Sequence, residues 1–352
     1  MNIYRDRVIA SMLLSAIGDA LGAPIEGLSL AKRKAFGRVE TYMSNSQHPW
    51  NGNLRPGQWT DDTQLMLVVA ESLIASGGRI NMDDMAARHV VAFDDARRDG
   101  IGWGRTTTRA VERLKSGVHW SNSGENLGEG YGAGNGVAMK VAPIGALLAL
   151  GRMAPNDVLP LAVMTHATAS GIAAGIAQAV AINECLQTDP DAFDGRDFSM
   201  RLTNNIKFGV HIGVKHAQRC GFPSADIESF MLRINQLEEI GTQNAACPAL
   251  FYLDRLSCET VARVFGANGF HAADSLPTTW AFFLRSPRSI GALYDVVNAC
   301  GDSDSNGAMC GALLGALNGT SIIPQYLIDQ LWMRERVVKT AENLCDVLGI
   351  FK

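Results

Sequence analysis

Three glycines, Gly307, Gly311 and Gly315, recur at four-residue spacing in an otherwise apolar run near the end of the chain. Residues four apart lie on one face of an α-helix, so this helix would present a stripe without side chains. A second helix can approach such a stripe closely. We therefore expect residues 305–317 to form a helix that packs tightly against another helix in the centre of a bundle.

Apolar residues follow helical spacing along most of the chain, while sustained alternation with a period of two is nearly absent. Strands should therefore be scarce. Helices are expected over 4–17, 62–76, 82–97, 106–115, 139–148, 156–165, 169–187, 198–217, 224–237, 255–265, 278–285, 288–299 and 325–347. Because no Pro/Ser-rich linker, charge tract or repeat divides the 352 residues, we predict one all-α domain over 1–352.

Charge and cysteine usage exclude several classes of protein. The net charge is −4, and the one basic block is Lys32-Arg33-Lys34, so the composition argues against a nucleic-acid partner. The seven cysteines form no CxxC pair, which argues against a zinc site. Reduced, mostly buried thiols are typical of a cytoplasmic protein, and this is the location we expect.

Two apolar stretches imitate membrane or export signals. Residues 8–14 follow two arginines as in a signal peptide, but Gly18-Asp19 interrupts the run before a cleavage site. Residues 161–182 have the length of a membrane span, yet they consist mainly of Ala, Gly, Thr and Ser. We expect two buried helical pieces with a break near 165–170, and no membrane partner.

A dense set of hard oxygen atoms lies at Thr60-Asp61-Asp62-Thr63, just before an apolar helical run. Mg²⁺ prefers carboxylate, hydroxyl and water oxygens, so the cluster is a candidate metal site. The alternative is local: Asp61-x-x-Gln64 has the form of a capping box, and acids in the first turn suit the helix dipole.

A second acidic cluster, Asp302-Ser303-Asp304-Ser305, leads into the helix with the glycine stripe. In an extended segment, residues two apart point the same way, so Asp302 and Asp304 can share a ligand. Capping of the helix by Asp304 or Ser305 is the alternative. Together the two clusters supply four carboxylates and at least two hydroxyls, enough to hold two hard cations.

Other candidate residues lie in loops. Glu26 is either a general acid/base or water-positioning group, or a solvated loop glutamate. The turn at 132–136 exposes backbone N–H groups that suit a phosphate. His166 lies at the expected helix break, as a cleft residue or as a buried core histidine. Trp103 and Tyr131 are loop aromatics that can stack on a base.

These motifs, in this order, resemble those of the ADP-ribosylglycohydrolase family, the group of dinitrogenase reductase-activating glycohydrolase and its animal relatives. The matching segments span residues 18–318, nearly the whole chain. They are Gly18-Asp19-Ala20-Leu21-Gly22 with Glu26, Thr60–Thr63, Gly134–Lys140, Thr165-His166 and Asp302–Ala308.

The resemblance implies an all-α fold around a cleft with two Mg²⁺ (or Mn²⁺) ions, and hydrolysis of a glycosidic bond at C1″ of ADP-ribose. It assigns the metal ligands to Thr60, Asp61, Asp62, Asp302, Asp304 and Ser305. It makes Glu26 the acidic residue of catalysis, with the metal-site residues Asp61 and Asp302 as further candidates. It places Gly134, Asn135 and Gly136 near the diphosphate and His166 along the cleft.

Three positions depart from the family pattern: Ser305 replaces a common Thr, Lys140 a common Arg, and Val137 a small or polar residue. None removes a metal ligand, so we expect an active enzyme that releases ADP-ribose from a modified protein, with arginine as the acceptor. One alternative is an immunity or antitoxin protein that occludes an ADP-ribosyltransferase through the loops at 36–59 and 241–275. Another is a Mg²⁺-dependent nucleotide phosphohydrolase.

Overall fold

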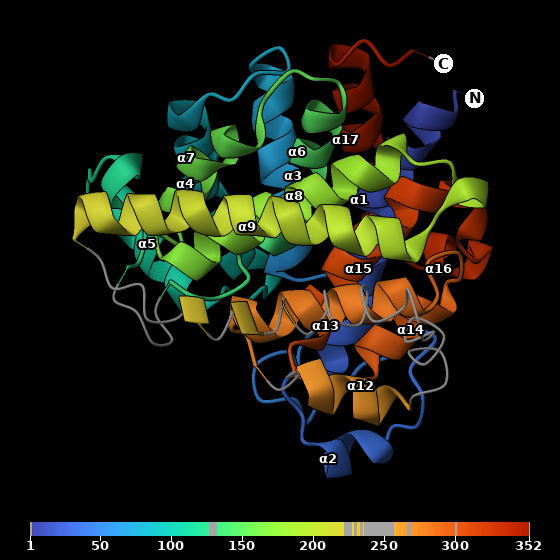
Figure 1. Ribbon diagram of the computed structural model, residues 1–352. Helices are drawn as coiled ribbons and strands as arrows, with labels where there is room; N and C mark the ends of the chain where they lie inside the picture. The colour runs from blue at the N-terminus through green and yellow to red at the C-terminus, as the bar shows by residue number, and fades with distance from the viewer. Residues whose placement is uncertain are drawn as a thin grey trace.

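The computed structural model describes residues 2–126, 132–221, 257–265, 269–299 and 301–351, and residues 227, 228, 231, 232 and 235. The described parts form an assembly of helices, and their only β-type contacts are the isolated bridges Glu125–His166 and Gly134–His271 (Figure 1). The all-α prediction is confirmed. The two ends of the chain lie close together at the top of the view in Figure 1.

The α-helices are α1 Ile3–Gly22, α2 Leu30–Lys34, α3 Asp61–Ala75, α4 Met82–Asp99, α5 Arg105–Lys115, α6 Ala142–Ala149, α7 Leu159–Val163, α8 Ala169–Gln187, α9 Gly195–Cys220, α12 Cys258–Phe265, α13 Ala272–Arg285, α14 Gly291–Val297, α15 Ser303–Asn318, α16 Gln325–Asp329 and α17 Arg334–Val347. Short 3₁₀ segments join several of them, including Ala23–Ile25, Ala138–Lys140 and Pro155–Val158.

Helices α1 and α15 form the centre of the molecule, and their glycines set how closely they approach. A Cβ atom on Gly311 would lie 2.1 Å from the carbonyl oxygen of Leu14, and one on Gly315 would meet the α1 backbone at 2.2 Å. The contact is reciprocal one turn along, where Gly18 and Gly307 each face the other's carbonyl. The predicted stripe is confirmed, and α1 carries its own glycines to match it.

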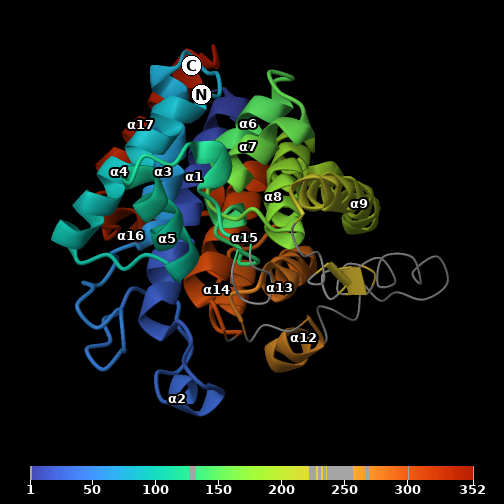
Figure 2. The same cartoon turned by 90° about the vertical axis from the view of Figure 1, so that its left-hand side faces the viewer.

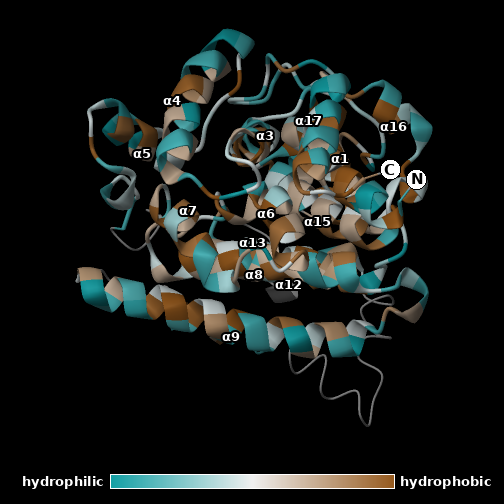
Figure 3. Ribbon diagram, turned by 90° about the horizontal axis from the view of Figure 1, so that it is seen from above, coloured by the Kyte–Doolittle hydropathy of each residue, from teal (hydrophilic) through white to brown (hydrophobic). Residues whose placement is uncertain are grey.

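The remaining helices surround this pair. Helices α3, α6 and α17 pack against α1, and α8, α13 and α14 pack against α15. Helix α9 crosses the outside of α8 and is seen end-on in Figure 2. Hydropathy follows this order, because outer helices such as α4 carry polar stretches while α1 and α15 are mainly apolar or neutral (Figure 3).

Two helices, α1 with its 3₁₀ extension to Ile25 and α8, are long and apolar enough to cross a membrane by length and composition. Both are buried inside the molecule, as core helices of a globular protein are. The expected break near 165–170 is present, since α7 ends at Val163 and α8 begins at Ala169.

Some predicted boundaries are wrong. We expected the first helix to end at residue 17, but α1 continues to Gly22 because Gly18 and Gly22 pack against α15. The helix expected over 325–347 is two helices, interrupted where Met333 adopts a left-handed conformation with φ 51°. The helix expected over 224–237 lies largely outside the described residues.

Candidate active site

The amino-terminal end of α3 is held by a residue that sequence reasoning did not select. Asp19, completely buried in α1, accepts hydrogen bonds from the backbone amides of Thr60 and Thr63, each at 3.0 Å. Both threonine hydroxyls also donate to it, at 2.9 and 2.6 Å. A carboxylate from another helix therefore caps α3. The expected capping box of Asp61 and Gln64 is wrong.

Gln64 has other partners. Its amide donates to the carbonyl oxygen of Ala92 and accepts from the indole of Trp103. Because Asp19 caps α3 from outside, the carboxylates of Asp61 and Asp62 are not needed as caps. The only signal for Asp19 in the sequence was a charged residue flanked by small residues in an apolar helix, within the Gly18–Gly22 motif.

The two adjacent carboxylates of α3 have different surroundings. Asp62 is buried, and its Oδ1 has no hydrogen-bond partner among the described residues. Asp61 is half-buried, and its Oδ2 accepts from the backbone amide of Gly104 at 3.1 Å. Burial raises the pKa of Asp61 to about 7, and burial together with the charges of Asp19 and Asp61 raises the pKa of Asp62.

The mouth of α15 supplies the second acidic group. Asp302 occupies the N-cap position without a side-chain capping bond, and Asp304 and Ser305 lie in the first helical turn. The alternative that Asp304 or Ser305 caps this helix is therefore wrong. So is the extended backbone assumed for this segment, because the helix begins at Ser303. The carboxylates of Asp302 and Asp304 nevertheless lie close enough to share a ligand.

Acids from α1, α3, the mouth of α15 and the loop at Glu26 form one cluster, and Asp61 is in neither of its two groups. Ligand atoms of Asp19, Asp62 and Asp304 lie within 4.8 Å of one another, and so do those of Glu26, Asp302 and Asp304. The two groups share Asp304. Burial and mutual repulsion raise the pKa of Asp302 to about 7 and that of Asp304 well above its usual range. So many buried carboxylates close together are costly unless cations or protons neutralise them.

The donor set fits hard divalent cations. All the atoms are oxygens, the carboxylates are close enough to share an ion, and the unpartnered Oδ1 of Asp62 offers a lone pair in the buried interior. The hydroxyl of Thr60 lies 3.3 Å from Oδ2 of Asp62, so its oxygen belongs to the same cluster. Ser305 is buried beside Asp304, with its hydroxyl 3.8 Å from the sulfur of Met139.

The glycine-rich turn contributes a side chain to the site. Asn135 donates its amide to Oδ2 of Asp302 at 2.6 Å and to the hydroxyl of Ser275 at 2.8 Å. Its backbone N–H donates to the carbonyl oxygen of Phe270, so that group is already engaged. A helix was expected from residue 139 onward, but the 3₁₀ segment Ala138–Lys140 comes first and α6 begins at Ala142. A role of Gly134 and Gly136 near a diphosphate stays a prediction.

His166 lies beneath this turn. A Cβ atom on Gly136 would lie 2.4 Å from the imidazole ring, so only glycine leaves room for it. The ring is 3 % exposed, and burial with the nearby charge of Lys140 lowers the pKa of His166 to about 3. His166 is therefore neutral and supports the turn. Its predicted contact with substrate stays a prediction.

Lys140 is a buried cation beside the acidic cluster. It is completely buried, and its Nζ lies 3.3 Å from the hydroxyl of Thr165. Burial lowers the pKa of Lys140 to about 7, while the charge of Asp61 opposes that shift. An ammonium in this position partly balances the negative charge of Asp61.

Of the two aromatic candidates, the structure describes Trp103 but not Tyr131. Trp103 is half-buried, donates its indole N–H to Gln64 at 2.8 Å and packs edge-on against Phe93. These contacts anchor the loop whose Gly104 binds Asp61. Stacking of Trp103 on the substrate stays a prediction. Tyr131 lies outside the described residues.

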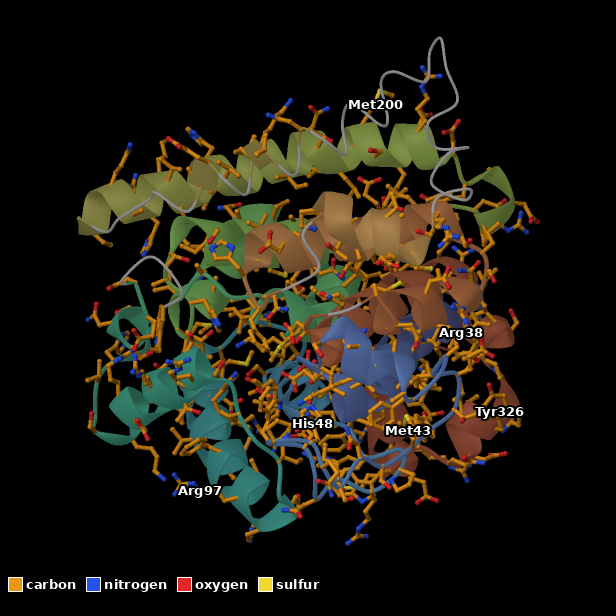
Figure 4. All side chains as sticks on the ribbon, turned by 90° about the horizontal axis from the view of Figure 1, so that it is seen from below. Arg38, Met43, His48, Arg97, Met200 and Tyr326 are labelled. Carbon is orange, nitrogen blue, oxygen red and sulfur yellow. The ribbon has the colours of Figure 1, made fainter. Side chains whose placement is uncertain are left out.

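Glu26 follows the 3₁₀ segment after α1 and is half-buried at the edge of the acidic cluster. Its Oε2 accepts from the indole N–H of Trp50 at 2.6 Å and from the amide of Asn51 at 2.8 Å. Both donors belong to the long loop between α2 and α3. The loop position of His48 beside α1 is visible in Figure 4.

Comparisons with known proteins agree with this arrangement. A family model described as ADP-ribosylglycohydrolase matches residues 1–349. The chain is 25% identical to ADP-ribosyl-[dinitrogen reductase] glycohydrolase of Rhodospirillum rubrum, covering 95% of this chain and 93% of that protein. It is 24% identical to ADP-ribosylarginine hydrolase Tri1 of Serratia proteamaculans, over 96% and 79% of the two chains.

A solved structure shares the fold. It is titled ADP-ribosylglycohydrolase-related protein complex, and it superposes with a TM-score of 0.63 over 99% of both chains at 25% sequence identity. The similarity therefore covers the helices that carry the acidic cluster as well as the outer ones.

Proposed function

Because the chain belongs to the ADP-ribosylglycohydrolase family, we propose that this hydrolase releases ADP-ribose from modified arginine side chains of a protein in the cytoplasm, with two Mg²⁺ or Mn²⁺ ions. The observation that carries the proposal is the convergence of carboxylates from α1, α3 and the mouth of α15 on one buried point. Arginine as acceptor is favoured by the similarity to a protein named as an ADP-ribosylarginine hydrolase.

The residues that would hold the ions are Thr60, Asp61, Asp62, Asp302, Asp304 and Ser305. When bound, the ions offset the repulsion within the cluster and orient the hydroxyls of the distal ribose. Asp19 binds Thr60 and Thr63 and so fixes the direction in which the α3 side chains leave the helix. Asn135 donates a hydrogen bond to Oδ2 of Asp302 and so fixes the orientation of that carboxylate.

Glu26 is the residue we assign to proton transfer. Two donors engage its Oε2, and Oε1 has no hydrogen bond with the described residues. In the proposed reaction, the carboxylate takes a proton from a water as the water oxygen bonds to C1″. The bond from C1″ to the guanidinium nitrogen breaks with its electron pair. The proton held by Glu26 then passes to the departing guanidine, so charge and atoms balance.

The test is release of ADP-ribose from an ADP-ribosyl-arginine peptide with Mg²⁺, alongside an ADP-ribosyl-serine peptide and free ADP-ribose. We expect turnover of the arginine peptide and its loss in Asp304→Ala, with the far-UV circular dichroism of the wild type retained. Asp329→Ala, at an exposed acid on α16, is the matched control. Cleavage of free ADP-ribose to AMP and ribose 5-phosphate, without release of ADP-ribose from either peptide, would instead identify a nucleotide phosphohydrolase, and cleavage of the serine peptide alone would overturn the arginine assignment.

A further inference from the structure

The loop between α2 and α3 wraps around the backbone that carries Glu26. Asn45 donates to the carbonyl oxygen of Pro24 at 2.8 Å, and Asn51 donates to that of Ala23 at 3.0 Å. The imidazole Nε2 of His48 lies 2.7 Å from the carbonyl oxygen of Glu26. Three side chains from one short loop thus bind three carbonyl groups within four residues.

The tautomer of His48 follows from its neighbours. Its Nδ1 accepts from the backbone amide of Asn51 at 2.9 Å and from that of Trp50 at 3.4 Å. A ring nitrogen that accepts carries no proton, so Nε2 carries it and donates to Glu26. The same ring packs edge-on against Trp50, with centroids 4.8 Å apart. His48 therefore orders the loop backbone at the two residues that reach the carboxylate.

The carboxylate of Glu26 accepts hydrogen bonds from two side chains of this loop. Trp50 uses its single indole N–H, and Asn51 divides its two amide hydrogens between Glu26 and the carbonyl oxygen of Ala23. Trp50 is 52 % exposed, so about half of this large side chain stays in contact with water. Burial alone does not account for its position, whereas the 2.6 Å bond to the carboxylate does.

A glycine makes the arrangement possible and joins it to the acidic cluster. Gly27 has φ 63°, and a Cβ atom on it would lie 3.0 Å from the ring of Trp50. Its N–H donates to the carbonyl oxygen of Gly301 at 2.8 Å, next to Asp302 at the mouth of α15. The clamped carboxylate is thereby held against the cluster rather than free to rotate into solvent.

We propose that Trp50 and Asn51 are positioning residues that clamp Oε2 of Glu26, so that Oε1 faces the reaction site. This inference rests on the proposed function of Glu26. A glutamate at a half-exposed position would otherwise sample several rotamers, and holding a proton-transfer group in its productive geometry raises the turnover rate more than it changes substrate affinity. The hydrogen bonds act through Glu26, so their effect vanishes when Glu26 is absent.

The experiment is a double-mutant cycle with Trp50→Phe, Asn51→Ala and Glu26→Ala. Trp50→Phe keeps the ring and removes the N–H. We expect kcat for the ADP-ribosyl-arginine peptide to fall about 10- to 100-fold with KM nearly unchanged, and Asn51→Ala to act in the same direction. In the Glu26→Ala background, Trp50→Phe should cause no further loss. Trp120→Phe, which removes an indole bond to Asp83, is the matched control and should leave kcat unchanged.

Equal loss of kcat with and without Glu26, or a rise in KM alone, would overturn the clamp and assign Trp50 to direct substrate contact. Thermal unfolding separates the clamp from the proposed function. If no ADP-ribosyl linkage is cleaved, the proposed function fails. The clamp still predicts that Trp50→Phe lowers Tm in the wild type and not in Glu26→Ala, and equal Tm losses in both backgrounds would contradict it.

Discussion

Asp19 in the buried helix α1 accepts hydrogen bonds from both the backbone amide and the hydroxyl of Thr60, at 3.0 and 2.9 Å. The two residues are 41 positions apart in the chain. The contact joins the central helix to the metal-ligand candidates of α3. An acid that repels the other carboxylates is retained because it satisfies N–H groups that the start of α3 would otherwise leave unpaired.

Replacing Asp19 should therefore weaken the fold as well as the site. Asp19→Ala leaves the amides of Thr60 and Thr63 buried without acceptors, but it also removes the cost of burying a carboxylate. We expect a net loss of about 2 kcal/mol in the free energy of unfolding, measured by chemical denaturation.

Two substitutions of Thr63, whose hydroxyl donates to Asp19, test the same contact from its other side. Thr63→Val removes one hydrogen bond to Asp19 and should cost about 1 kcal/mol, whereas Thr63→Ser keeps the hydroxyl and should cost less. Asp19→Ala with wild-type stability would show that the capping bonds contribute nothing to the free energy of unfolding.

Asn135 should matter through Asp302. Asn135→Ala removes the 2.6 Å bond to Oδ2 of Asp302, so this carboxylate loses a donor that orients it and favours its charged form. We expect the affinity for Mn²⁺, measured by isothermal titration calorimetry, to fall about 10- to 100-fold. Ser275→Ala leaves that bond in place and should cause a smaller loss. Equal losses in the two variants would place the effect in the packing of the turn.

Patterns that are local in the chain were predictable from the sequence. The four-residue spacing of Gly307, Gly311 and Gly315 requires only helical periodicity, and the bounds 169–187 predicted from the apolar run are those of α8. The two acidic clusters were likewise visible, because each occupies a few consecutive residues next to a helix start.

What the sequence did not reveal depends on contacts between distant residues. Asp19 could be placed in the site only once its bonds to Thr60 and Thr63 were known, and nothing local distinguishes it from a helix-end acid. The clamp on Glu26 needs the loop around Trp50 to fold back on it. Gly18 looked like a helix terminator because an isolated helix would lose stability there, whereas packing against Gly307 outweighs that cost.

The close approach of α1 and α15 gives a direct stability prediction. Gly311→Ala places a methyl group 2.1 Å from the carbonyl oxygen of Leu14, a backbone atom that cannot move without separating the helices. Alanine favours a helix by about 1 kcal/mol, but overpacking should cost about 3 kcal/mol, so the variant should be less stable. Thermal unfolding measures the change.

The control for Gly311 is a glycine with open space. Gly102 has no atom within 4 Å of an added Cβ, so Gly102→Ala should change Tm little. A Gly311→Ala variant as stable as the wild type would mean that the two helices do not approach as closely as described.

The affinity of the acidic cluster for cations should rise with pH, because its carboxyl groups have raised pKa values. Burial raises the pKa of Asp19 to about 6 and the pKa values of Asp61 and Asp302 to about 7 in the metal-free protein. The folded state therefore binds these protons more tightly than the unfolded chain. In the metal-free protein, these three carboxyl groups contribute their full stability below about pH 4, the pKa of an aspartate in the unfolded chain. That contribution is lost as the pH rises through about 6 to 7, where the groups ionise in the folded state.

The buried histidines oppose this trend. Burial lowers the pKa values of His89 and His166 to about 3, so their neutral forms add stability as pH rises from 3 to about 6.5. The pH dependence of stability without metal therefore contains both the carboxyl and the histidine contributions. The difference in Tm with and without Mn²⁺ removes the contribution of the histidines, because it is common to both measurements.

We expect the Mn²⁺-induced rise in Tm to grow between pH 5 and pH 8, because the acids must release their protons before they bind a cation. The measurement is thermal unfolding in EDTA and in excess Mn²⁺ across this range. Asp304, which both acidic groups share, provides the control: Asp304→Ala should abolish most of the rise at every pH. A Mn²⁺ effect that is constant with pH, or larger at pH 5, would show that the buried carboxylates do not hold the ion.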